Sequence, residues 1–199
     1  HPDGMERWKE ILAHLPSYLL DEEGGLKEWA WEGTVENLNH RHVSHHYDAW
    51  PGHAVTWEDT PALAKAIQIS NRKRGQQNDS AHGILHRLLT AIRLKDTDDA
   101  WQNLKQVLDH GFVRPNLMGN HFPHKVYFAD TTGSLPAIMD EMLIFSDEGI
   151  IEFLPALPPF FKKGAIEGLW TFSAAKINHM EWDLEKKTVK AELISLQDQ

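Results

Sequence analysis

Residues 80–111 read S-A-H-G-I-L-H-R-L-L-T-A-I-R-L-K-D-T-D-D-A-W-Q-N-L-K-Q-V-L-D-H-G and contain two helical repeats in succession. In each repeat the apolar residues recur every three or four positions, which places them on one helical face. They are Ile84, Leu85, Leu88, Leu89 and Ile92, and then Ala100, Trp101, Leu104, Val107 and Leu108. Asp96-Thr97-Asp98 is typical of a helix start and Gly111 of a helix end. The stretch predicts two helices joined by a short link, which favours an antiparallel pair.

The same periodicity extends over the first two thirds of the chain. It predicts helices over residues 5–15, 61–74 and 134–145, the second after an N-cap at Asp59-Thr60 with Pro61 at its first position. Two long irregular stretches, residues 21–58 and 115–132, separate these helices. Connections of such length inside a compact domain are usually functional, so both are candidate site regions.

After Gly149 the pattern changes from helical to alternating. We expect strands over residues 150–154, 165–172, 176–182 and 188–195, with a hairpin tip at residues 185–187. Helices followed by antiparallel strands indicate a mainly α chain with a small antiparallel β-domain. The predicted division is a helical part over residues 1–148 and a C-terminal β-domain over residues 149–199.

Composition excludes several classes of protein. The formal charge of −9 over 199 residues argues against a duplex-binding protein, and the longest apolar runs are too short to span a membrane. The absence of cysteine excludes disulfides and thiolate chemistry. No signal-peptide pattern is visible in His1-Pro2-Asp3-Gly4, and the start without methionine suggests a piece of something longer. The unusual entries are thirteen histidines and eight tryptophans.

The densest polar cluster is His40-Arg41-His42-Val43-Ser44-His45-His46-Tyr47, followed by Trp50-Pro51-Gly52-His53. Three interpretations stay open for it. His42 and His46, four apart on a helix, are spaced to share a metal ion, although the zinc-hydrolase pattern needs a glutamate where Val43 stands. The histidines are otherwise packing groups of a polar loop, or they face a ligand.

A ligand that suits neighbouring histidine and tryptophan is a sugar. Its C–H faces pack on indole rings, and its hydroxyls need donors and acceptors. Trp29, Trp31, Trp50, the histidine cluster and His121-Phe122-Pro123-His124 would form such a lining. Each tryptophan taken alone is equally well explained as a core residue.

Two carboxylates are candidates for catalysis. Glu28 precedes Trp29, whose indole would desolvate it and raise its pKa, as a general acid requires. Asp130 lies in Tyr127-Phe128-Ala129-Asp130-Thr131-Thr132-Gly133, where the simpler explanation is a helix N-cap. Paired carboxylates are the groups that glycoside hydrolysis uses.

In three segments the chain resembles the C-terminal part of glycoside hydrolase family 95, the inverting α-L-fucosidases and their α-galactosidase relatives. Residues 26–51 resemble its Q-x-Q-E-W stretch followed by H-R-H-x-S-H-L-Y-x-x-Y-P-G. Residues 130–143 resemble its D-G-N-F-G segment and the helix ending E-M-L. Residues 153–169 resemble L-L-P-A-L-P followed by G-x-x-x-G-L.

The resemblance implies part of an (α/α)6 toroid followed by a β-domain. It implies Glu28 as general acid and Asp130 as the residue that supports water attack, about 6.5–9.5 Å apart for inversion. The implied sugar-binding residues are Trp29, His40, His42, His45, Trp50, His82 and His121. The implied partner is an oligosaccharide or glycoconjugate, with no cofactor, metal, nucleic acid or membrane, and a secreted or periplasmic location.

The chain also departs from the family pattern. The paired water-activating asparagines of the family lie upstream of the acid, so the remaining N-terminal part of such an enzyme would have to supply them. Thr131-Thr132 stands where the family has G-N, and His82 and His86 stand where it has tryptophans. The alternative to a hydrolase is therefore a non-catalytic carbohydrate-binding or scaffold protein with the same fold.

Overall fold

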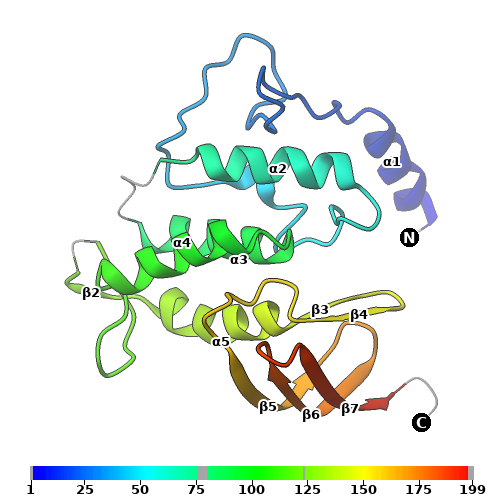
Figure 1. Cartoon of the computed structure of the whole chain (residues 1–199). Helices are drawn as coiled ribbons and strands as arrows, with labels where there is room; N and C mark the ends of the chain where they lie inside the picture. The colour runs from blue at the N-terminus through cyan, green and yellow to red at the C-terminus, as the bar shows by residue number, and fades with distance from the viewer. Residues whose placement is uncertain (1, 76–79, 123, 197–199) are drawn as a thin grey trace.

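The computed structural model describes residues 2–75, 80–122 and 124–196. Of the segments discussed above, His1 and Pro123 lie outside the described residues. The helices α2, α3, α4 and α5 lie in layers above a three-stranded sheet, and α1 lies at one side of them (Figure 1). This arrangement agrees with a helical part followed by a small β part.

Three of the predicted helices form almost as expected. They are α2 (Pro61–Lys73), α3 (Ala81–Arg93) and α4 (Thr97–Asp109). Pro61 occupies the start of α2, where its missing N–H costs nothing. Asp96 caps α4 by accepting a hydrogen bond from the backbone N–H of Asp99. The first helix, α1 (Pro2–Ala13), leaves its apolar stripe exposed, with Trp8 at 64% and Leu12 at 66% of their free areas.

The last helix, α5, differs from its predicted bounds at both ends. It covers Ala129–Leu143 and so begins five residues before the predicted start at residue 134. Its N-cap is Phe128, which means that the N-cap explanation of Asp130 is wrong. The C-terminal part of the predicted helix is instead β3 (Ile144–Asp147), which pairs with β4 (Ile150–Phe153).

The other strands form two antiparallel sheets. β1 (Asn120–His121) and β2 (Val126–Tyr127) make a short hairpin in the second irregular stretch. β5 (Lys163–Trp170), β6 (Ala175–Asp183) and β7 (Thr188–Ser195) form the C-terminal meander in the order β5-β6-β7. The predicted tip at residues 185–187 is confirmed, because Asp183 pairs with Thr188 across it.

A single hydrophobic cluster joins the helices to the C-terminal sheet. Leu88 of α3 and Met142 of α5 belong to it, and so do Ile177 and Met180 of β6, all of them fully buried. The sheet therefore covers apolar surface of α3 and α5 that would otherwise be exposed to water. The predicted division at residues 148/149 falls in the turn of the β3–β4 hairpin.

The long stretch 21–58 is irregular, as predicted, apart from one 3-10 turn, η1 (Ser44–His46). Its first part loops over the outer side of α2, and its second part, with η1, passes on the side of α2 that faces α3 (Figure 1). Its Leu26 and Ala49 belong to a second buried cluster with Ile67 of α2. Within the described residues no helix is long and apolar enough to cross a bilayer.

Candidate active site

Glu28 lines a cavity of about 340 Å³ between the stretch after α1 and the η1 turn. Its side chain is only 11% exposed, and its Oε2 lies 3.3 Å from Nη2 of Arg74, whose side chain is 1% exposed. The charged neighbour of Glu28 is thus a guanidinium. The indole of Trp29, which was expected to desolvate Glu28, is itself 49% exposed.

Arg74 also fixes the state of His45, which lines the same cavity. Its Nη2 lies 3.1 Å from Nε2 of His45. Because a guanidinium only donates, this nitrogen accepts and the ring proton sits on Nδ1. Burial, with the positive charge of Arg74 adding to it, lowers the pKa of His45 to about 3. His45 is therefore a neutral group, and its Nδ1–H is buried without a hydrogen-bond partner among the described residues.

The hydroxyl group of Ser70 contacts both His45 and the adjacent His46 and holds His46 in place. Oγ of Ser70 lies 3.0 Å from Nε2 of His45 and 3.1 Å from Nε2 of His46. Ser70 therefore bridges the two imidazole rings. His46 is fully buried, and burial lowers its pKa well below the usual value. His46 is thus a structural member of the cluster, positioned by α2.

Asp130 lines a second cavity, of about 130 Å³, with Trp50, His82 and His86. It lies in the first turn of α5, where the helix dipole favours an anion. His86 lies 3.0 Å from the carbonyl oxygen of Trp50 through its Nε2, which must donate, and the two rings meet edge to face. The cavity thus combines an indole, two imidazoles and a carboxyl group.

His42 contacts a residue that lines the second cavity. Its ring lies 5.3 Å from that of His82 and 5.4 Å from that of His40 between centroids. Burial lowers the pKa of His42, the charges of Arg41, His82 and His40 add to this effect, and the negative charge of Glu28 opposes it. The series of predicted residues at the two cavities therefore consists of Glu28 and His45 at the first, His82, Trp50 and Asp130 at the second, and His42 against His82.

Other predicted residues lie apart from this series. His121 stacks on Phe128 at 4.7 Å between centroids, in the β1–β2 region, and lines neither cavity. Trp31 is 77% exposed and lines neither cavity. His40 and Trp29 are exposed, and only His40 contacts the series, through His42.

Sequence reasoning missed Arg74 and Ser70, and it also missed Tyr18, whose hydroxyl donates to Asp48 at the edge of the Glu28 cavity. That hydrogen bond, with burial adding to it, raises the pKa of Tyr18 to about 12. Ser70 lies in the last turn of α2 and Arg74 directly follows that helix, four residues later, so helical spacing was available to link them with each other. Nothing in the sequence linked them to the histidine cluster, because that contact is tertiary.

The geometry for metal binding by His42 and His46 does not form. His42 precedes the η1 turn and contacts His82, whereas His46 is buried against Ser70. In the part of the chain that the structure describes, no three histidine or carboxylate side chains converge as metal ligands would.

Comparison with known proteins identifies the family of the chain. The family model for the glycosyl hydrolase family 95 catalytic domain matches residues 1–143. The chain belongs to glycoside hydrolase family 95. The region that matches the family model ends at Leu143, so it includes all of α5, the helix that carries Asp130.

A curated relative of this family 95 chain is alpha-L-fucosidase 2 of Arabidopsis thaliana. The two are 30% identical over an alignment of 168 residues, and the alignment covers 79% of this chain. The matched region is only 20% of the relative, so the chain spans about a fifth of that protein.

Proposed function

We propose that this chain carries part of the active site of an inverting glycoside hydrolase that removes a terminal α-L-fucose or α-galactose residue from an oligosaccharide or glycoconjugate. The observation that carries the proposal is that Glu28 and Asp130 line two cavities of a family 95 chain, the first with His45 and the second with Trp50 and His82. These imidazoles and the indole suit a neutral sugar, because they supply hydrogen bonds and apolar contact.

In this mechanism Glu28 protonates the glycosidic oxygen and Asp130 supports the attack of water from the opposite face of the ring. Arg74 is a positioning residue, since it contacts both Glu28 and His45. Trp50, His42, His45 and His82 contact the sugar. Trp29, His40 and His121 belong to the proposed binding surface on the basis of the sequence alone.

The chain on its own is expected to be a poor catalyst, because the family's water-activating asparagines lie upstream of the acid and outside this sequence. We expect the longer protein, with the rest of the catalytic domain joined to this chain, to hydrolyse 4-nitrophenyl α-L-fucoside or α-galactoside. The 199-residue chain should show little turnover of either substrate. Efficient hydrolysis by the short chain that Glu28→Gln abolishes would contradict this expectation.

The roles of the two carboxylates are tested in the longer protein. Loss of a general acid typically lowers kcat by about 10²–10⁴-fold, and we expect this from Glu28→Gln. Glu32→Gln, at an exposed carboxylate of the same stretch, is the matched control and should retain activity. The first anomer released, followed by proton NMR, should be inverted. A retained product, or full activity of Glu28→Gln, would reject the mechanism.

A second candidate function is non-catalytic carbohydrate binding, and one observation favours it. Thr132, at the position of the family's asparagine, accepts a hydrogen bond from the backbone N–H of Gly119 at 2.9 Å. Its hydroxyl is therefore engaged in holding the second irregular stretch against α5. If this function is correct, the longer protein should bind sugar without hydrolysing it, and binding should survive both Glu28→Gln and Asp130→Asn.

A further inference from the structure

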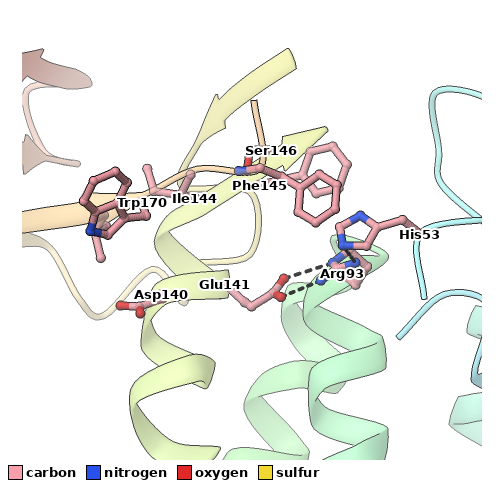
Figure 2. A pocket seen from close by; sticks show the side chains of 10 residues that line it. His53, Arg93, Asp140, Glu141, Ile144, Phe145, Ser146 and Trp170 are labelled. Carbon is pink, nitrogen blue, oxygen red and sulfur yellow. Dashed lines mark hydrogen bonds and ion pairs between the residues drawn. The ribbon is translucent and has the colours of Figure 1, made fainter. Parts of the chain in front are cut away.

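A third cavity, of about 180 Å³, lies where the end of α5 and strand β3 meet the end of β5 and the loop that follows it (Figure 2). Its polar lining includes His53, Arg93, Asp140 and Glu141, and its aromatic lining includes Trp170. None of these residues lines either cavity of the proposed active site. The proposed reaction therefore gives this cavity no role.

At the inner end of the cavity, the charges of Arg93 and Glu141 cancel in an ion pair that hydrogen bonds hold in place. Arg93 donates to both carboxylate oxygens of Glu141, with its Nε 2.9 Å from Oε2, and its side chain is 5% exposed. It also donates to the carbonyl oxygen of Gly52 at 3.1 Å. This fixed ion pair leaves each Glu141 oxygen with further acceptor capacity toward the cavity.

The cavity lining also holds polar groups that the fold leaves unused. His53 accepts from Nη1 of Arg93 at 3.1 Å through Nε2, so its proton is on Nδ1. This Nδ1 is buried and has no hydrogen-bond partner among the described residues. The carboxyl group of Asp140 makes no hydrogen bond or ion pair with the described part of the chain, and partial burial and the charge of Glu141 raise its pKa. An unpaired carboxyl group at the cavity favours a ligand that donates hydrogen bonds.

The aromatic groups set the shape of that ligand. Trp170 is 69% exposed and lies at the same end of the cavity as Asp140 (Figure 2). Phe172 stacks on His53 at 4.5 Å between centroids. An exposed indole beside a carboxyl group suits a ring with apolar C–H faces and outward hydroxyls.

The charges of the lining favour a neutral ligand over an ion. The carboxylates of Asp140 and Glu141 disfavour an anion in the cavity. A cation would find only the Asp140 carboxylate unpaired, because Arg93 neutralises Glu141 and the ammonium of Lys176 already lies 5.8 Å from the centre of the Trp170 ring. The remaining ligand is neutral, and the small volume limits it to about one ring, below the ~300 Å³ of sites for drug-sized ligands.

We propose that this cavity is a second saccharide-binding subsite, which holds one neutral pyranose ring on Trp170 with its hydroxyls donating to Asp140 and Glu141. The subsite lies between the helical part and the C-terminal sheet and does not depend on Glu28 or Asp130. It would hold a sugar residue of a glycan while another part of that glycan occupies the active site.

The test is saturation-transfer NMR on the chain with methyl α-L-fucoside, methyl α-D-galactoside and methyl α-D-glucoside. We expect at least one of them to bind, and Trp170→Ala and Asp140→Ala each to weaken binding by about tenfold, which is ~1.4 kcal/mol. Trp8→Ala, at an indole of α1 that is 64% exposed, is the matched control and should bind as the parent does. Unchanged melting temperatures of the variants would confirm that the fold is intact.

The Glu28→Gln/Asp130→Asn double variant separates this proposal from the proposed function. Binding that persists in the double variant and is lost in Trp170→Ala supports the subsite, even if the longer protein hydrolyses no glycoside. Binding that survives Trp170→Ala, or is lost in the double variant, overturns it. Absence of saturable binding by all three glycosides, or preferential binding of tetramethylammonium, also overturns it.

Discussion

At the scale of single residues, the histidine cluster is better described by its protonation than by its number of imidazoles. Burial and Arg74 keep His45 neutral, and burial does the same for His46. Both rings are therefore uncharged in the folded chain at pH values where they would begin to protonate in the unfolded chain. The cluster was predicted from the sequence, but its charge state depends on burial and on Arg74, and both arise only in the folded protein.

The difference between the pKa values of these histidines in the folded and the unfolded chain predicts that the protein loses stability in mild acid. The folded-state pKa of His45, about 3, lies below its unfolded value of about 6.5, so the unfolded chain binds more protons between these pH values. The contribution of His45 is complete above pH ~6.5 and is lost as pH falls toward 3. Between pH 7 and 5 it should amount to about 2 kcal/mol of unfolding free energy.

Urea unfolding at several pH values measures this contribution. His45→Gln removes the titrating group and should make the dependence of stability on pH less steep by about one proton in this range. His46 should act in the same direction. An unchanged pH dependence in His45→Gln would show that His45 is not held neutral by its surroundings.

At the scale of elements, α3 positions the histidine cluster through the close approach of Gly83. A Cβ atom at Gly83 would lie far inside van der Waals contact with the carbonyl oxygen of Arg41. This carbonyl is backbone, so Gly83→Ala has to separate α3 from the loop that carries His42. We expect a cost of about 1–3 kcal/mol and weaker contact between His42 and His82.

Gly133 of α5 is the matched control, because a Cβ atom there meets nothing within 4 Å. Gly133→Ala should stabilise the protein by about 0.5–1 kcal/mol through the higher helix propensity of alanine. Thermal unfolding of the two variants should therefore move in opposite directions. Equal destabilisation by both would mean that the loop and α3 are not in contact.

Regular apolar periodicity predicted α2, α3 and α4 closely, but the prediction was wrong at both ends of α5. The first turn contains Thr131, Thr132 and Gly133, which are poor helix formers, and its helical state depends on tertiary packing of the buried Thr131. At the other end, Met142 to Phe145 is a continuous apolar run, and such runs do not distinguish a buried helix from a buried strand. β3 was missed for this reason.

For the candidate site too, local sequence patterns revealed the residues, whereas their arrangement depends on tertiary contacts. The motifs containing Glu28, His45 and Asp130 were visible in the sequence. Their distribution between two cavities was not, because it depends on where α2 and α3 place the irregular stretch 21–58.

At the scale of the whole molecule, the sheet and the helices share one hydrophobic cluster, so they should unfold together. Ile177 of β6 is fully buried in this cluster. Ile177→Ala should cost about 2–5 kcal/mol, and the loss should extend to α3, because the cavity left behind lies in the shared core. Independent domains over residues 1–148 and 149–199 would confine the loss to the sheet.

Hydrogen exchange resolved by segment distinguishes these outcomes. In Ile177→Ala the amides of α3 should lose as much protection as those of β6, since both exchange through the same global opening. Ile194→Ala, at a β7 side chain that is 39% exposed, is the control and should reduce protection by less than about 1 kcal/mol in either segment. Full protection of α3 in Ile177→Ala would establish two domains. In that case the saccharide subsite proposed at the junction would lie between two units that open separately.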